Sequence, residues 1–126
     1  MPTEKIQLTL PASEEYEEIA QTAIAHLAIR RGFTLTEVED LRLIMGEVTR
    51  LLLNSEGNTE NIHLNYEVTK DHLMLEAYLD ESTKGPLPQK DIERFSEVVS
   101  ELLDQLSIDN EKNSILLTKY RLGSET

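Results

Sequence analysis

Two acidic side chains lie where a carboxylate could do chemistry. The first, Glu47, falls in a stretch with helical spacing, next to the apolar residues Ile44, Val48 and Leu51. A carboxylate in such surroundings could act as a general base by activating a water or a hydroxyl group. The simpler interpretation is an acid on the polar edge of a helix, and the residues alone favour that interpretation.

The second carboxylate is Asp80, which follows a strand-like segment. Together with Glu81 it could bind a hard cation through oxygen ligands, although acids at strand ends are common in so acidic a chain. His26, His63 and His72 lack the spacing of metal ligands and are expected on the surface, and the chain has no cysteine. The sequence also lacks the P-loop, GxGxxG, GxSxG and HExxH motifs. We therefore predict no metal site.

The net charge narrows the classes of partner. Among 126 residues, 12 Lys and Arg stand against 24 Asp and Glu, so the formal net charge is −12. This charge repels phosphates, which disfavours nucleic acid and anionic membrane surfaces and favours basic protein partners. Acidity that only maintains solubility explains the composition equally well. No segment has the roughly 20 apolar residues of a membrane span, and Met1 to Gln7 has no signal-peptide core, so we expect a cytoplasmic protein.

Alternation and helical spacing divide the first half of the chain into three elements. Positions 5–10 alternate between apolar and polar residues and predict a half-buried strand. Ser13 is expected to cap a first helix that ends at Gly32. A second helix is predicted from Thr36 to Asn54, opened by a capping box of Thr36 and Glu39.

The second half predicts a hairpin, a helix and a final strand. Positions 62–68 and 73–79 alternate, positions 54–58 form a turn, and positions 80–90 form the longest loop. Asp91 is expected to cap a third helix, and Ser114 to Tyr120 to form the last strand. The stripe of the third helix is Ile92, Phe95, Val98, Val99, Leu102, Leu103 and Leu106.

This order of elements predicts an α+β fold. The expected architecture is a two-layer α/β sandwich with a mixed four-stranded sheet and three helices on one face. Its length suits one domain, residues 1–126.

A set of short motifs lies between Leu10 and Leu53. It comprises the strand end LPA, the aromatic Tyr16, the helix exit Arg31-Gly32-Phe33 and the run EVEDLRLIMGE. In order and spacing these resemble the N-terminal part of the bacterial anti-sigma factor and serine-protein kinase family. That family belongs to the superfamily of histidine kinases, gyrase B and Hsp90-type ATPases, whose Bergerat-like fold agrees with the predicted order. The second half of the chain is compatible with this fold but carries no family motif.

The resemblance implies a nucleotide site, and two of its parts can be sought here. In the first, a glutamate base is followed four residues later by a magnesium-ligating asparagine. Glu47 matches the base, but Leu51 stands at the ligand position and has no oxygen to offer a cation. In the second, an adenine-binding aspartate is followed by two spaced glycines; Asp80 matches the aspartate, while Ser82 and Lys84 replace the glycines.

The third implied part is a glycine-rich lid whose backbone amides cradle phosphates. From Pro86 to Asp91 the chain reads PLPQKD, without paired glycines, and proline has no N–H to donate. Losing the metal ligand, both glycines and the lid together predicts that magnesium-ATP does not bind. We therefore expect no cofactor.

The resulting interpretation is a degenerate, non-catalytic member of this family. By resemblance it would bind a sigma factor or an anti-sigma antagonist and pair as a homodimer. One alternative is an active ATP-dependent serine-protein kinase that uses Glu47 as base, and another is an interaction or dimerisation module in two-component signalling. The partner surface is expected on the exposed face of the first helix, at Glu15, Glu18, Gln21 and Arg30.

Overall fold

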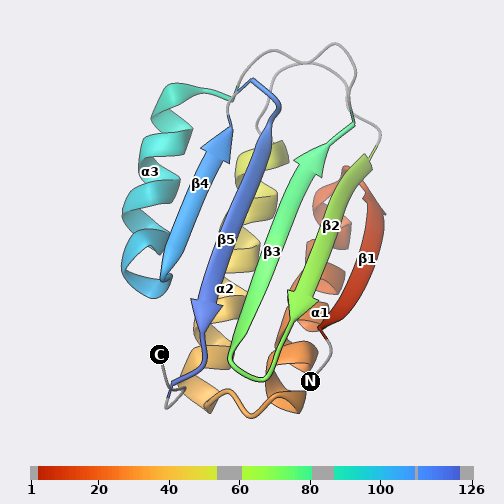
Figure 1. Ribbon diagram of the computed structural model, residues 1–126. Helices are drawn as coiled ribbons and strands as arrows, with labels where there is room; N and C mark the ends of the chain where they lie inside the picture. The colour runs from red at the N-terminus through yellow and green to blue at the C-terminus, as the bar shows by residue number, and fades with distance from the viewer. Residues whose placement is uncertain (1–2, 54–60, 81–86, 110, 123–126) are drawn as a thin grey trace.

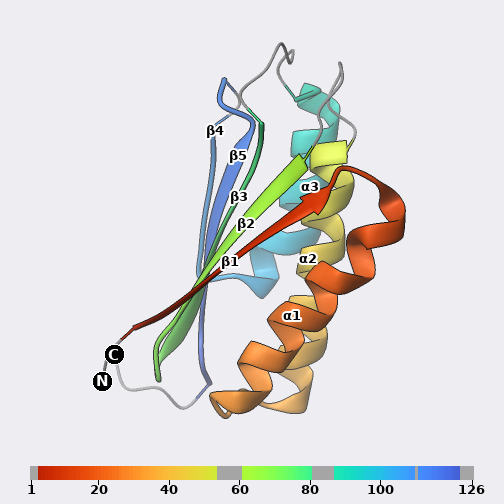
Figure 2. The same cartoon turned by 90° about the vertical axis from the view of Figure 1, so that its right-hand side faces the viewer.

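The fold is a two-layer α+β sandwich. The computed structural model describes residues 3–53, 61–80, 87–109 and 111–122. Three α-helices cover one face of a single sheet, and no described helix lies on its other face, called the open face (Figures 1 and 2). The elements are β1 (Glu4–Pro11), η1 (Glu14–Tyr16), α1 (Glu17–Arg30), α2 (Leu35–Leu53), β2 (Asn61–Val68), β3 (His72–Leu79), α3 (Gln89–Val99), η2 (Ser100–Leu102), β4 (Gln105–Asp109) and β5 (Ser114–Tyr120).

The sheet differs from the predicted one in strand number and direction. It has five strands in the order β1-β2-β3-β5-β4, and every neighbouring pair is antiparallel. The prediction of a mixed, four-stranded sheet was therefore wrong, although the sandwich and the three helices on one face are confirmed. Direction was not readable from the chain, because two helices separate β1 from its partner β2.

The extra strand, β4, lies where the third helix was expected to continue. The apolar stripe keeps helical spacing through Leu106, but α3 ends at Val99. Leu106 and Ile108 instead alternate with exposed neighbours in a strand paired to β5. Five register positions pair β4 with β5 and satisfy backbone N–H and C=O groups along that edge of β5.

The helix caps also shift from their predicted positions. Pro88, rather than Asp91, precedes the first residue of α3. Gly32 leaves α1 with φ +82, as expected for a glycine at a helix exit. At the start of α2 the capping box is formed by Thr34 and Glu37 instead of Thr36 and Glu39. The predicted turn at 54–58 lies outside the described residues.

Glu37 ties the start of α2 to the end of the chain that follows β5. Its carboxylate accepts hydrogen bonds from the backbone N–H groups of Thr34 at 2.7 Å and Leu122 at 2.6 Å, and only 7% of the residue is exposed. In return Thr34 Oγ1 accepts a hydrogen bond from the N–H of Glu37 at 3.2 Å. The side chain of Glu37 therefore caps α2 and also holds the chain segment that follows β5 against the start of that helix.

Glu37→Ala is expected to lower the free energy of unfolding by about 2 kcal/mol, since it removes a cap and leaves a tertiary N–H without its acceptor. Urea unfolding measures this loss, and amide exchange of Leu122 should accelerate. The matched control is Glu39→Ala, at the exposed glutamate of the other TxxE pattern, where a change below about 0.5 kcal/mol is expected. Equal losses in the two variants would contradict the assigned cap.

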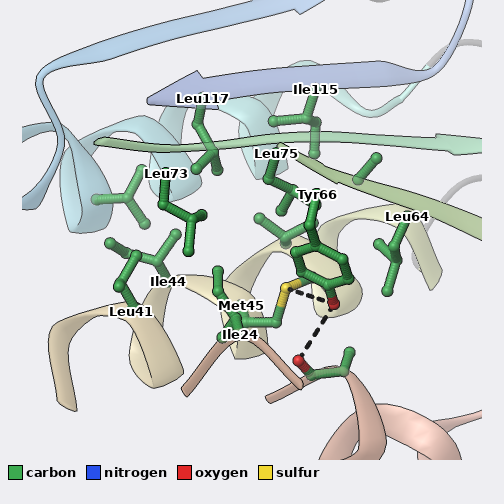
Figure 3. Packing of buried hydrophobic residues seen from close by; sticks show 14 of the residues in the cluster. Ile24, Leu41, Ile44, Met45, Leu64, Tyr66, Leu73, Leu75, Ile115 and Leu117 are labelled. Atoms are coloured by element: carbon green, nitrogen blue, oxygen red, sulfur yellow. Dashed lines mark hydrogen bonds between the residues drawn. The ribbon is translucent and has the colours of Figure 1, made fainter. Parts of the chain in front are cut away.

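The core lies between α2 and the inner face of the sheet. Figure 3 shows Leu41, Ile44 and Met45 of α2 pointing toward residues of β2, β3 and β5. Among the sheet residues, Tyr66 is 1% exposed, and its hydroxyl donates a hydrogen bond to the carbonyl of Ala20 in α1 at 3.3 Å. Burial raises the pKa of Tyr66, because the phenolate would lose its hydration.

The pKa shift of Tyr66 predicts how stability depends on pH. The folded pKa lies above the unfolded value of about 10, so the stabilising contribution is complete below that pH and is lost as the pH rises beyond it. The loss is expected to approach about 1.4 kcal/mol per pH unit. Tyr66→Phe removes this titration, so urea unfolding at increasing alkaline pH should show a smaller decline than in the wild type. Parallel declines in the two proteins would contradict the burial of the hydroxyl.

None of the helices in the described residues is long and apolar enough to cross a membrane.

Candidate functional site

Glu47 is buried where α2 faces α3. The residue is 7% exposed, and both carboxylate oxygens are engaged. Arg50 of the same helix donates from Nη1 to Oε2 at 2.7 Å, and Arg94 of α3 donates from Nη1 to Oε1 at 3.1 Å. The two arginine side chains are about half exposed, at 51% and 59%. Glu47 therefore does not lie on a solvated polar edge, and each of its carboxylate oxygens accepts a hydrogen bond from an arginine.

Leu51 lies one turn beyond Glu47 and belongs to the core. It is 3% exposed and borders a space of only about 20 Å³. That volume holds about one water molecule. The residues around it are Glu47, Arg50, Leu51, Asp91, Arg94 and Phe95. Apolar packing and two guanidinium groups thus surround the position at which the resemblance implies a metal ligand.

Asp80 is held at the end of β3. Its Oδ2 accepts a hydrogen bond from the backbone N–H of Asn61 at 2.8 Å, and its Oδ1 lies 2.5 Å from Nε2 of His63. The ring of His63 stacks on Tyr78, with centroids 5.0 Å apart. His63 was predicted as a surface residue, but the structure makes it a half-buried partner of Asp80.

The structure does not bring Glu47 and Asp80 to one site. Glu47 contacts α3 within the helix layer. Asp80 reaches His63, which alternates with the buried Ile62 and Leu64 and so faces the open side of the sheet. Positions 81–86, which hold the expected glycine positions Ser82 and Lys84 and the start of the lid, lie outside the described residues. Across the described ranges, no three His, Cys, Asp or Glu side chains gather in a way that could hold a metal.

The two arginines at Glu47 were not predicted. The spacing of Glu47 and Arg50 is a readable signal, because residues three apart on a helix are neighbours. Arg94 carried no such signal, since its contact depends on how α3 packs. Three of the residues expected on the partner surface, Glu15, Glu18 and Gln21, line a cleft of about 490 Å³. The other lining residues of this cleft are Glu14, Glu17, Arg50 and Leu53.

Gln21 is half-buried and donates to the carbonyl of Arg42 at 3.0 Å, so it also joins α1 to α2. Arg30 lies at the other end of α1. The partner surface itself stays a prediction.

Comparison with curated proteins identifies the relatives of this chain. A protein of Oceanobacillus iheyensis is 24% identical over 135 residues, which span 91% of this chain and 85% of that protein. It carries the name serine-protein kinase RsbW. The chain is similar to RsbW proteins. The resemblance to the serine-protein kinase family is thereby confirmed, whereas no protein-family model matches the chain.

Other RsbW proteins give similar alignments. RsbW of Bacillus velezensis is 27% identical over 81% of this chain and 65% of its own length. RsbW of Listeria monocytogenes is 30% identical over 61% of this chain and 47% of its own length. This chain thus spans less than two thirds of these two RsbW proteins. The names assign kinase activity to the relatives, and the contacts of Glu47 and Leu51 bear on whether this chain shares it.

Proposed function

We propose that this chain is a non-catalytic regulatory relative of RsbW that binds a protein partner. The 126 residues would act as one degenerate histidine-kinase-like ATPase domain in the cytoplasm of a bacterium. The partner would be a sigma factor or an anti-sigma antagonist. The observation that carries the proposal is the pairing of Glu47 with two arginines beside the buried Leu51.

The chemistry of phosphate transfer explains why this arrangement matters. A general base must reach the proton that it removes, but both oxygens of Glu47 already accept hydrogen bonds from guanidinium groups. Magnesium requires oxygen ligands in a hydrated octahedron, and Leu51 supplies none. Two arginine charges beside Glu47 also disfavour a divalent cation at that position. Asp80, at the implied adenine position, is bound to His63 on the open face.

Partner binding that does not depend on nucleotide is the expected behaviour. The purified chain would be titrated with the sigma factor and with the antagonist encoded by the same genome, in magnesium-ATP, in magnesium-ADP and without nucleotide. We expect one of the two proteins to bind with the same affinity in all three conditions. No binding to either protein, or a dissociation constant that changes tenfold or more with ATP, would contradict the proposal.

The alternative is an active serine-protein kinase, and the name shared by the relatives favours it. It requires Glu47 to leave at least one arginine when substrate binds. Under this alternative the chain phosphorylates the antagonist, and Glu47→Gln abolishes the transfer while the fold remains. If the chain is non-catalytic, we expect no phosphate transfer to the antagonist from either the wild type or Glu47→Gln.

We also propose that the chain pairs as a homodimer through β1 and α1. No described strand pairs with the outer edge of β1. Beside that edge lies a groove of about 600 Å³, lined by Ile6, Glu18, Ile19, Thr22, Ala23, His26 and Leu27. Ile19 is 46% exposed there, although its position in the helical stripe predicts burial. Two copies of β1 could pair antiparallel, which would satisfy both strand edges and cover both grooves.

Ile19→Glu is expected to convert the dimer to a monomer, because it places a charge in the apolar groove. Sedimentation equilibrium measures the change. Ile29→Glu is the matched control: Ile29 belongs to the same helix and is 60% exposed but does not line the groove. A monomeric wild type, or equal effects of the two substitutions, would contradict this dimer.

A further inference from the structure

A hydroxyl, an imidazole and a carboxylate form a hydrogen-bonded chain on the open face of the sheet. Thr9 of β1 lies directly opposite His63 of β2 in the strand register. Thr9 Oγ1 is 3.3 Å from Nδ1 of His63, and Nε2 of the same ring is 2.5 Å from Oδ1 of Asp80. Three segments far apart in the sequence thus supply one chain of hydrogen-bonding side chains. This chain of side chains is separate from Glu47 and its arginines.

The neighbours of His63 fix its orientation, and an ionised Asp80 would select its tautomer. Tyr78 stacks on the ring at an interplanar angle of 19°, and the N–H of Asn61 holds the carboxylate of Asp80. An ionised carboxylate only accepts hydrogen bonds, so Nε2 of His63 carries a proton. In the neutral ring Nδ1 is then the acceptor, and the hydroxyl of Thr9 donates to it.

We propose that Thr9 is a nucleophile that accepts an acyl group, with His63 as its base and Asp80 as the residue that positions the base. An alcohol becomes an effective nucleophile when an oriented base removes its proton. Thr9 is exposed, and none of the described helices covers the face that carries it, so a small activated ester can reach the oxygen. The substrate class is therefore an activated acyl donor with a small acyl group.

The step balances with the groups present. Thr9 Oγ1 attacks the carbonyl carbon of the ester, and its proton passes to Nδ1 of His63. The bond from the carbonyl carbon to the leaving oxygen breaks, and the leaving group departs with that electron pair. The new bond is the ester of Thr9. The imidazolium, stabilised by Asp80, returns its proton to solvent or to the leaving oxygen.

The chain contains a comparison pair that lacks the carboxylate. Thr69 Oγ1 lies 3.2 Å from Nδ1 of His72, a contact similar in length to that of Thr9 and His63. The backbone N–H groups of Asp71 and His72 already donate to this hydroxyl oxygen. The ring of His72 meets Tyr120 edge-on, and no described carboxylate bonds to it. Thr69 should therefore remain unreactive.

Acetylation by p-nitrophenyl acetate tests the proposal. The intact protein is treated briefly, and the acetylated residue is located by peptide mass spectrometry. We expect acetyl-Thr9 without acetyl-Thr69, loss of that adduct in Thr9→Val, and a rate at Thr9 about 100-fold lower in His63→Gln. Thr69→Val should leave the rate at Thr9 unchanged. Acetylation confined to lysines and the N-terminus, or an unchanged rate at Thr9 in His63→Gln, would overturn the proposal.

Nitrogen NMR of the imidazole separates positioning by Asp80 from a purely structural effect. The wild type should show a protonated Nε2 and an unprotonated Nδ1 in His63. Asp80→Asn should redistribute the proton between the two nitrogens and slow acetylation of Thr9, while circular dichroism confirms that the fold persists. An unchanged tautomer combined with an unchanged rate would overturn the role assigned to Asp80.

Discussion

Leu51→Asn should lower the free energy of unfolding by about 3 kcal/mol, although it installs the residue type that the resemblance implies for binding magnesium. Leu51 is 3% exposed, and the space beside it is about 20 Å³. An amide there loses its hydration and leaves part of the core unfilled. Urea unfolding measures the loss, and calorimetry with magnesium-ATP should still show no binding.

The control for this prediction is Leu43→Asn on the same helix. Leu43 is 48% exposed, so the same change in residue type affects mainly helix propensity, and a loss within about 1 kcal/mol is expected. If Leu51→Asn were as well tolerated as Leu43→Asn, Leu51 would not be a core residue. Binding of magnesium-ATP by Leu51→Asn would show that one substitution separates this chain from an active site.

Phe95→Ala is expected to lower the free energy of unfolding by about 4 kcal/mol. Only Phe95 and Val99 of α3 are buried, and Phe95 is 1% exposed. Removing the ring takes away the larger of the two buried side chains that hold α3 in the helix layer. Arg94, the neighbour of Phe95, should then lose its hydrogen bond to Glu47.

Hydrogen exchange followed by mass spectrometry should show α3 losing protection before α2. Phe95→Leu serves as the control, since it keeps most of the buried volume and should lower stability by about 1 kcal/mol. Uniform loss of protection across the domain in Phe95→Ala would contradict the local anchoring of α3.

The sequence predicted those elements whose signals are local. The strand at 114–120 was predicted with its observed bounds, and the helix from 36 to 54 was displaced by one residue at each end. The capping box was misplaced because Thr34 and Thr36 both precede a glutamate by three residues. Only the packing of α2 and the bond from Leu122 to Glu37 distinguish the two patterns.

The remaining differences depend on tertiary structure. β4 was not predicted, because Leu106 fits both a helical stripe and a strand. The pairing of β4 with β5 decides between the two. Arg94 lies 47 positions after Glu47 in the sequence, so no sequence pattern signals their contact. The pairing of His63 with Asp80 was partly readable, because His63 and Tyr78 are opposite in the predicted hairpin and Asp80 shares the alternation of Tyr78.

Titration with magnesium-ATP decides whether this chain is a non-catalytic protein. Isothermal titration of the wild-type chain with magnesium-ATP measures the nucleotide affinity. The antagonist protein is then added to the same mixture of chain and magnesium-ATP, and phosphate transfer to the antagonist is measured. We expect no saturable heat and no phosphoserine on the antagonist. Micromolar affinity for magnesium-ATP, or phosphate transfer that Glu47→Gln abolishes, would show instead that the chain is an active kinase.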